Sequence, residues 1–357
     1  AVRSVSGSAT CYIRDGLPYC WGNKIFNLLG DNVTTTHPTP QLVSGISSVT
    51  QIATGAPTGG SFGIRTGGEL KAWGQGSIAH LGNNSIYPVS GLQSVYGLGA
   101  NVTKVASGPT AACAVVGGAV KCWGENGDGQ LGGNYISTAT SFLSTSPALG
   151  YLEAHSTAVS APVSVSGISE GATSVAVGLS SSCAILNTGA LKCWGSQAGG
   201  LLGDNTIAGT SPVPVQVSGL SSGVAGVGVG FRNACAISNT GALTCWGNNG
   251  NGQIGDNTLT LRRVPTQVSG LTSGVSAVAL SGAVGSVCAI VSGAVKCWGY
   301  NDYGTIGDNT TTPKAVPTQV SGLTSGFVQV AFGKHHVCAL KSDSTIYCWG
   351  YNQFGQL

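Results

Sequence analysis

Residues 213–257 read VPVQVSGLSSGVAGVGVGFRNACAISNTGALTCWGNNGNGQIGDN, and the pattern of short apolar runs and turns in this segment predicts the fold. It holds four short runs of apolar and β-branched residues, at 213–217, 224–229, 235–237 and 243–246, separated by turns rich in Gly, Ser and Asn. Short runs of this kind with tight turns predict β-strands rather than helices. Four such strands in one period are the content of a single propeller blade.

The same unit recurs along the whole chain of 357 residues, and the tryptophans mark it. Each of the seven is followed by Gly, and successive ones lie 52, 50, 71, 52, 52 and 51 residues apart. They are Trp21, Trp73, Trp123, Trp194, Trp246, Trp298 and Trp349. A fixed period of this size is typical of a propeller or a solenoid. We therefore expect an all-β, seven-bladed β-propeller with four short antiparallel strands per blade, forming a single domain over residues 1–357.

Composition excludes several other classes of protein. Gly accounts for 58 residues and charged residues for only 8%, which does not fit a coiled coil, whereas 42% hydrophobic residues are enough to bury a core. The net charge is +3, and no basic stretch exceeds the pair Arg262–Arg263. We expect no nucleic-acid partner. No apolar run approaches the length of a membrane span, so we expect no membrane insertion.

One run in each unit has very small side chains, which predicts its place in the fold. Small residues fit where seven strands converge on a central axis and their backbones crowd together. We assign these runs as the innermost strands. They are 51–53, 104–106, 175–177, 227–229, 278–280 and 330–332.

The order of motifs within each unit resembles a known family. An inner strand ending in Gly is followed by Cys-Ala-Ile or Cys-Ala-Leu, a turn, Lys-Cys-Trp-Gly-x-Asn and Gly-Gln-Leu/Ile-Gly. This pattern resembles the seven-bladed propeller repeats of the regulator of chromosome condensation family, over essentially the whole chain. That family includes a chromatin-bound nucleotide exchange factor, a secreted bacterial inhibitor of β-lactamases and ubiquitin-ligase modules. The resemblance implies the fold and leaves the function open.

The cysteines distinguish this chain from intracellular members of that family. All twelve fall in pairs nine or ten residues apart around a Gly-containing turn, where hairpin positions face each other. We expect six disulfides, because four zinc ligands do not converge in this pattern. The expected pairs are Cys11 with Cys20, Cys113 with Cys122, Cys183 with Cys193, Cys235 with Cys245, Cys288 with Cys297, and Cys338 with Cys348.

The cysteine pattern also explains the second unit, which has no pair, and indicates the redox compartment. In the second unit both cysteines are replaced together, by Phe62 or a neighbour and by Ala72, as expected for a paired constraint. Disulfides persist in oxidising surroundings and are rare in the cytosol. Six of them indicate an oxidising compartment, extracellular or at the cell surface.

The recurring Gly-Asp-Asn loops carry the main candidates for metal-binding or acidic catalytic groups. A carboxylate that occurs once per blade is typical of a turn in which it caps local backbone N–H groups, and Ca²⁺ binding is the other interpretation. The residues are Asp31, Asp204, Asp256 and Asp308, with Asn83–Asn84 as the variant.

The adjacent His335 and His336 point opposite ways in an extended segment and make a poor metal site. No catalytic motif is recognisable. We expect no metal, no cofactor and no enzymatic activity.

The long interval between Trp123 and Trp194 contains an insertion of about 19 residues, from about Gly133 to Ala161. It carries apolar and aromatic side chains in a Ser/Thr-rich background, which is typical of a contact loop on a rigid scaffold. The alternative is that the segment folds back as a plug or a packing flap. The candidate binding residues are Tyr135, Phe142, Tyr151, Leu152 and His155.

These features favour a non-catalytic binding or structural module outside the cell. We expect it to contact a protein or glycan through propeller loops and the insertion, and its partners include copies of itself or another surface subunit. The alternative hypothesis is a secreted inhibitor of an enzyme. Glycosylation motifs lie at Asn32, Asn83, Asn101 and Asn309.

The sequence contains six runs of the outer-strand type, one fewer than the seven expected blades. Runs of the Pro-Val type follow the Trp-Gly loops at 40–43, 88–89, 162–165, 212–217, 265–268 and 317–320, whereas the other three strand types each occur seven times. One blade, at the chain ends, is therefore expected to have three strands and an open edge. Either further polypeptide supplies the missing strand, or a neighbouring molecule donates it and links propellers into an assembly.

Overall fold

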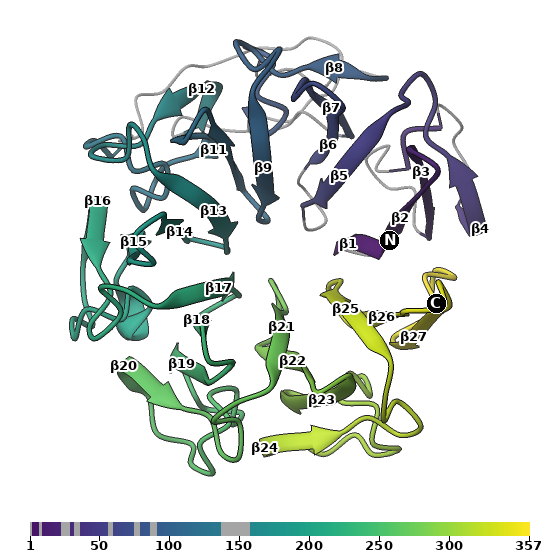
Figure 1. Cartoon of the computed structure of the whole chain (residues 1–357), viewed down its shortest axis with the longest axis vertical. Helices are drawn as coiled ribbons and strands as arrows, with labels where there is room; N and C mark the ends of the chain where they lie inside the picture. Colours follow the sequence, from purple (N-terminus) through teal and green to yellow (C-terminus); the bar gives the residue numbers. More distant parts are fainter. Residues whose placement is uncertain are drawn as a thin grey trace, which may run out of the picture.

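Seven antiparallel sheets follow one another around a central axis in the computed structural model (Figure 1). The structure describes residues 2–6, 9–22, 29–31, 36–55, 60–74, 79–85, 91–136 and 158–357. Within these residues six sheets have four strands and the last has three. The prediction of a seven-bladed β-propeller with one incomplete blade is confirmed. We number the blades one to seven along the chain.

Each blade is built outward from the axis. The innermost strands are β1 (Val2–Ser6), β5 (Val49–Thr54), β9 (Val102–Ser107), β13 (Ala172–Val177), β17 (Val224–Val229), β21 (Val275–Leu280) and β25 (Phe327–Phe332). The second strands are β2 (Ala9–Arg14), β6 (Gly60–Arg65), β10 (Ala111–Val116), β14 (Ser181–Leu186), β18 (Asn233–Ser238), β22 (Ser286–Val291) and β26 (His336–Lys341). The third strands are β3 (Leu17–Gly22), β7 (Leu70–Gly74), β11 (Ala119–Glu125), β15 (Leu191–Ser196), β19 (Leu243–Gly247), β23 (Ala294–Gly299) and β27 (Ile346–Gly350).

Six fourth strands complete the described sheets. They are β4 (His37–Leu42), β8 (Gln93–Ser94), β12 (Ala158–Ser164), β16 (Thr210–Gln216), β20 (Arg262–Gln267) and β24 (Lys314–Gln319). A short 3-10 turn, η3 (Ala198–Gly200), lies between β15 and β16. No helix in the described part of the chain is long and apolar enough to span a bilayer.

All six small-residue runs lie in innermost strands, as predicted (Figure 1). The reason is visible where the ends of these strands approach each other. A Cβ on Gly108 would lie 2.2 Å from the carbonyl oxygen of Gly178, and one on Gly178 would lie 2.5 Å from that of Gly230. Neighbouring blades therefore leave no room for a side chain at these positions.

The fourth strands show how the sequence repeat relates to the blades. β16 pairs with β15, and not with β17, so the unit at 213–257 begins with the last strand of blade four and continues into blade five. In the second blade the fourth strand is Gln93–Ser94, and the predicted run at 88–89 lies outside the described residues. The longer fourth strands of blades four to six end one residue before a buried valine, at Val217, Val268 and Val320.

The six predicted disulfides are all present, each within its own blade. In every pair the two cysteines face each other across the second and third strands, with Cα atoms 4.0 to 4.2 Å apart. No free cysteine is found in the described residues. The bonds join Cys11 to Cys20, Cys113 to Cys122, Cys183 to Cys193, Cys235 to Cys245, Cys288 to Cys297, and Cys338 to Cys348.

Blade two shows what replaces a disulfide in this fold. Phe62 faces Ala72 in the register that the cysteines occupy elsewhere, and both side chains are fully buried. A large ring opposite a methyl group thus fills the space of the bridge. The predicted partner of Ala72 is therefore Phe62 itself rather than a neighbour.

The tryptophans connect each blade to the one before it. The indole N–H of Trp298 donates a hydrogen bond of 3.0 Å to the carbonyl oxygen of Gln253, in the loop between the third and fourth strands of blade five. Gly255 follows two residues later with a φ of +76°, and a Cβ there would lie 2.7 Å from that indole nitrogen. Equivalent bonds join Trp123 to His80, Trp194 to Gln130, Trp246 to Leu201 and Trp349 to Thr305. The glycine of each Gly-Asp-Asn loop therefore packs against the indole ring of the next tryptophan.

Two histidines are buried between blades. His80 accepts a hydrogen bond of 2.6 Å from the backbone N–H of Gly60, and burial lowers its pKa to about 4. His336 lies 2.9 Å from the hydroxyl of Thr10 in blade one, and burial, followed by repulsion from His335, lowers its pKa to about 3. Both rings are therefore neutral in the folded protein near neutral pH.

Removing one disulfide tests whether the hairpin bridges add stability without setting the fold. The double variant Cys235→Ala, Cys245→Ala opens a closed loop of about eleven residues, and we expect it to lose on the order of 2–3 kcal/mol of unfolding free energy. Its far-ultraviolet circular dichroism should match the wild type, because blade two already folds without a bridge. Loss of the β signal would contradict this account.

The buried histidines predict a loss of stability on mild acidification. Their folded pKa values lie below the ordinary value of about 6.5, so the unfolded chain binds protons first. The stabilising effect is complete above about pH 6.5 and declines as the pH falls toward the folded pKa values. Urea unfolding at pH 7 and pH 5 should show a decrease on the order of 1–3 kcal/mol. His80→Gln should make this decrease smaller, and an unchanged pH dependence would contradict the assignment.

Candidate binding rim

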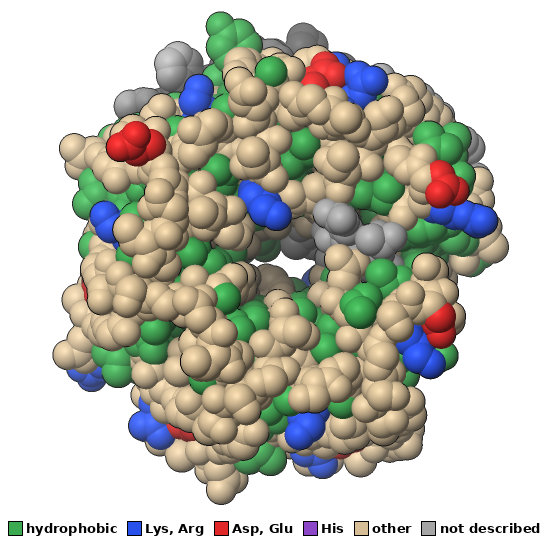
Figure 2. Space-filling view, viewed as in Figure 1, with side chains coloured by type: hydrophobic (Ala, Val, Ile, Leu, Met, Phe, Trp, Pro, Cys, Tyr) green, Lys and Arg blue, Asp and Glu red, His purple; other side chains and the backbone are tan. Residues whose placement is uncertain are grey.

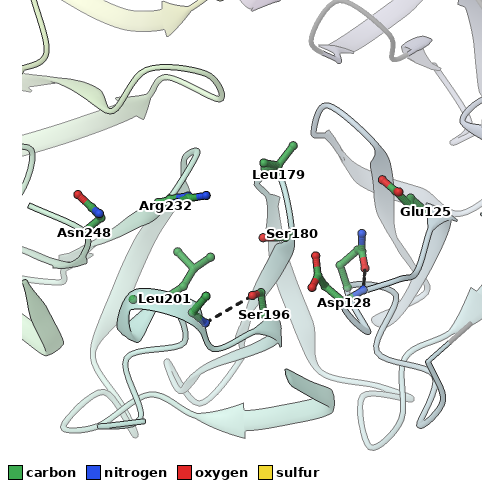
Figure 3. A pocket seen from close by; sticks show the side chains of 11 residues that line it. Glu125, Asp128, Leu179, Ser180, Ser196, Leu201, Arg232 and Asn248 are labelled. Carbon is green, nitrogen blue, oxygen red and sulfur yellow. Dashed lines mark hydrogen bonds between the residues drawn. The ribbon is translucent and has the colours of Figure 1, made fainter. Parts of the chain in front are cut away.

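Two kinds of loop come together on one face of the ring. One kind joins the first strand of a blade to its second, and the other joins the third strand to the fourth. Residues from both kinds, in blades three, four and five, line a single pocket (Figure 3). We call this face the loop rim.

The pocket on the loop rim is polar and has a volume of about 450 Å³. Glu125 and Asp128 lie on one side of it and Arg232 on the other, with Ser180 and Ser196 between them (Figure 3). Burial raises the pKa of Asp128. The lining contains no histidine or cysteine among the described residues, so the two serines have no base of that kind beside them. This arrangement suits the binding of a polar ligand that carries both a positive and a negative group. It is less suited to nucleophilic catalysis.

An aromatic cluster occupies the loop rim of blades six and seven. The rings of Tyr303 and His335 have centroids 4.2 Å apart, and Tyr351 lies 5.3 Å from Tyr303 and 6.1 Å from His335. Tyr300 and Phe354 extend the cluster, at 6.2 Å from Tyr303 and 6.3 Å from Tyr351 respectively. The side chain of Tyr303 is exposed. We call these five residues the aromatic cluster.

Alignment of the repeats shows that the aromatic cluster sets the last two blades apart from blades three to five. Tyr300 and Tyr351 lie two residues after a blade tryptophan, and Tyr303 and Phe354 lie five residues after it. The equivalent positions are Asn248 and Asn251 in blade five, Ser196 and Gly199 in blade four, and Glu125 and Asp128 in blade three. These aromatics are not among the binding residues predicted from the sequence, although comparison of the repeats reveals them. Burial, aided by Asp302, raises the pKa of Tyr300 to about 12, so its hydroxyl stays neutral.

His335 and His336 have separate environments, as their opposite directions predicted. His335 lies in the aromatic cluster, whereas His336 is buried against Thr10 of blade one. Burial lowers the pKa of His335 to about 4. The aromatic cluster therefore carries no positive charge near neutral pH.

The Gly-Asp-Asn carboxylates organise their own loops. Asp256 accepts hydrogen bonds from the backbone N–H and the hydroxyl of Thr258, at 3.1 and 2.7 Å, and pairs with Arg262. Asp308 does the same with Thr310 and lies 3.2 Å from the Lys314 amine. Burial acts to raise their pKa values, but these bonds and cations lower them overall. The predicted turn role is present in both loops. In the described residues no three His, Cys, Asp or Glu side chains gather as a metal site.

A buried asparagine adds to each of these loops. In blade five the amide oxygen of Asn249 accepts the backbone N–H of Ile254 at 2.9 Å, and its nitrogen donates to the carbonyl oxygens of Thr258 and Thr260, each at 3.0 Å. Asn301 makes the same contacts in blade six. This asparagine fixes the loop that carries the rim side chains.

One of the predicted insertion residues is described. Tyr135 is exposed, with 38% of its surface accessible, and its carbonyl oxygen accepts a hydrogen bond of 3.0 Å from the buried amide of Asn126. Phe142, Tyr151, Leu152 and His155 lie outside the described residues. β12 begins at Ala158, so the end of the predicted insertion belongs to the fourth strand of blade three. Of the glycosylation motifs, Asn101 and Asn309 are exposed, Asn83 is half-buried, and Asn32 lies outside the described residues.

The repeat has relatives among characterised proteins. The Regulator of chromosome condensation (RCC1) repeat matches residues 224–253, 240–290, 292–340 and 327–356. The ultraviolet-B receptor UVR8 of Arabidopsis thaliana is 28% identical over 185 residues, which are 51% of this chain. The match spans 42% of the length of UVR8.

Solved structures share the fold over nearly the whole chain. Human WBSCR16 superposes with a TM-score of 0.78 at 20% identity, covering 95% of this chain and 86% of that protein. Yeast RCC1 (Prp20), solved with Kap60 bound, gives a TM-score of 0.73 at 18% identity, covering 99% of this chain and 81% of that one. The fold and the loop rim thus define a repeat-built propeller scaffold. The chain is a seven-bladed β-propeller whose blades five to seven match the RCC1 repeat.

Proposed function

We propose that this protein is a non-catalytic binding or structural module, extracellular or at the cell surface, that contacts a protein or glycan through its loop rim. The observation that carries the proposal is the aromatic cluster. It departs from the repeat at the two rim positions where blades three to five carry polar or small residues. A departure from the repeat on an exposed rim is not needed for the fold, which favours a role in recognition.

Aromatic rings on a rigid rim suit both kinds of partner. Tyrosine is enriched at protein interfaces, because its ring supplies contact area and its hydroxyl a hydrogen bond. The C–H face of a sugar ring packs on the same kind of surface. Charged residues make up only 8% of the sequence. On the one face of the molecule seen in Figure 2 they are scattered, with no single-sign patch. Packing and hydrogen bonds, rather than charge attraction, would then drive binding.

The compartment is inferred from the cysteines. Twelve cysteines form six intra-blade disulfides, and such bonds persist in oxidising surroundings and are rare in the cytosol. We infer that the protein acts outside the reducing cytosol. There, the same bridges protect the exposed hairpins against unfolding.

Relatives support a role in binding. UVR8 is named as a receptor, and yeast RCC1 was solved with Kap60 bound. The inference for this chain is a propeller that presents loops to a partner. The insertion at about 133–161 is a second contact candidate, because it lies in the chain segment that connects the third and fourth strands of blade three.

A secreted inhibitor of an enzyme is the second candidate function. It would require aromatic side chains contributed by loops of more than one blade, and the aromatic cluster meets that requirement in blades six and seven. In this case the partner would be an enzyme whose active-site entrance the loop rim covers.

Binding assays with rim variants test the proposal. The wild-type protein should be screened against immobilised glycans and against cross-linked extracts of its own cell envelope. We expect the double variant Tyr303→Ser, Tyr351→Ser to weaken binding of the captured partner about tenfold or more, because aromatic anchors often contribute about 2 kcal/mol each. Tyr96→Ser is the matched control, since Tyr96 is 61% exposed in blade two, outside the aromatic cluster.

A further variant separates the insertion from the aromatic cluster. Replacing residues 135–155 with a short Gly/Ser link should leave the propeller folded, because loop length costs little closure entropy. If only this variant loses the partner, the insertion carries recognition in place of the aromatic cluster. A partner bound equally well by all variants would refute binding through the rim.

A further inference from the structure

The pocket on the loop rim brings together charged side chains that are exceptions to the repeat. Three repeat positions supply them: the second and fifth residues after the tryptophan, and the third residue before the first cysteine of the pair, or before Phe62 in blade two. Across all seven repeats, Lys, Arg, Asp or Glu occurs at these positions only as Glu125, Asp128 and Arg232. All three line this one pocket, although they belong to blades three and five (Figure 3). The fold does not require this coincidence, which favours a role in binding.

Small residues of blade four make the space between the charged side chains. At the two positions after the tryptophan where blades six and seven carry aromatic rings, blade four carries Ser196 and Gly199. Among the described residues, a Cβ on Gly199 would have only the Cδ1 atom of Leu261 within 4 Å, at 3.8 Å. The resulting volume of about 450 Å³ is in the range of sites for small ligands.

Both charged walls of the pocket are held by contacts of their own loops. On the acidic side the backbone N–H of Asp128 donates to the side-chain oxygen of the buried Gln130 at 2.9 Å. On the basic side the Arg232 guanidinium lies 5.2 Å from the centroid of the Phe231 ring, and the Arg232 carbonyl oxygen accepts the N–H of Asn248 at 2.8 Å. The pocket is therefore preformed, and a ligand needs to order little of the protein.

The charged groups themselves are available to a ligand. Within the described part of the chain the carboxylates of Glu125 and Asp128 have no hydrogen bond or ion pair, and the Arg232 guanidinium has only the face of the Phe231 ring as a partner. Burial raises the pKa of Asp128, as expected for a carboxylate that no cation offsets. A ligand ammonium group would supply that cation. A ligand carboxylate would match the two-pronged geometry of the guanidinium.

The lining between the charged walls indicates the kind of ligand. Ser180 and Ser196 lie between Arg232 and the acidic side chains, and their hydroxyls can bond to polar groups of a ligand (Figure 3). Leu179 and Leu201 add apolar surface. A free amino acid carries its ammonium and carboxylate groups on one carbon atom, so it cannot place them on opposite sides of the pocket. A short peptide carries these groups at its two ends, with amide groups between them.

We propose that this pocket binds a short peptide with free ends. The N-terminal ammonium group lies beside Glu125 and Asp128, and the C-terminal carboxylate pairs with Arg232. The amide groups of the peptide bond to Ser180 and Ser196. This site uses charge and hydrogen bonds, whereas the aromatic cluster of blades six and seven offers packing surface. The proposal therefore does not rest on the partner of the aromatic cluster.

Trialanine with free ends is the probe for titration calorimetry on the intact wild-type protein at pH 7 and low salt. We expect saturable binding at one site per chain. Acetylation of the peptide removes the ammonium group and amidation removes the carboxylate, so each modified peptide should bind about tenfold more weakly or worse. Free alanine should lose at least as much, because it reaches one wall only.

Variants of the protein locate the two ends of the peptide. Arg232→Gln should weaken trialanine binding about tenfold but have little effect on the amidated peptide, which has no carboxylate to lose. Asp128→Asn should show the same relation to the acetylated peptide. Arg263→Gln is the matched control, because it removes an exposed guanidinium from β20 in the same blade as Arg232, and it should bind trialanine as the wild type does.

Several results would overturn the proposal. They are the absence of saturable trialanine binding to the wild-type protein, equal binding of the free, acetylated and amidated peptides, and trialanine binding that neither Arg232→Gln nor Asp128→Asn weakens. The peptide comparisons use the wild-type protein, so they decide the question even if a variant does not fold. Capture of a partner by the aromatic cluster is measured separately, and failure of trialanine binding would leave that proposal standing.

Discussion

The fit of the tryptophans from Trp73 to Trp349 against the loop of the preceding blade is the constraint on which this propeller depends. The indole ring requires a glycine with positive φ beneath it, as at Gly203, Gly255 and Gly307. Its N–H satisfies a buried carbonyl oxygen of the same loop. In the described part of the chain neighbouring blades share no sheet, so these contacts and buried apolar side chains such as Val268 and Leu271 join them. Spacing between tryptophans therefore equals the length of one blade, except where the insertion lengthens it.

Much of this architecture was predictable because seven copies repeat the same signals. The Trp-Gly period predicts the blade number, the small residues predict the inner strands, and the cysteine spacing predicts the hairpin bridges. The repeat alone does not show where a blade begins. The sequence repeat at 213–257 groups β16 with β17, whereas in the structure β16 is the last strand of blade four and β17 is the first strand of blade five. The contact between Tyr303 of blade six and His335 of blade seven depends on loop geometry, which the sequence spacing of the repeats does not reveal.

Function in a repeat protein is expected where the copies differ. The described chain departs from its own repeat at the aromatic cluster and at the pocket beside Asp128. Both lie on the loop rim. A rigid ring that presents such a rim fits a binding module, and disulfides are typical of an oxidising location.

The most direct measurement of the central constraint is the unfolding free energy of Trp298→Phe. Phenylalanine keeps an aromatic ring over Gly255 but removes the N–H that reaches the carbonyl oxygen of Gln253. We predict a loss on the order of 1–3 kcal/mol in urea unfolding, from the unsatisfied carbonyl group and the smaller ring. An unfolding free energy equal to that of the wild type would contradict the claim that these tryptophans join the blades.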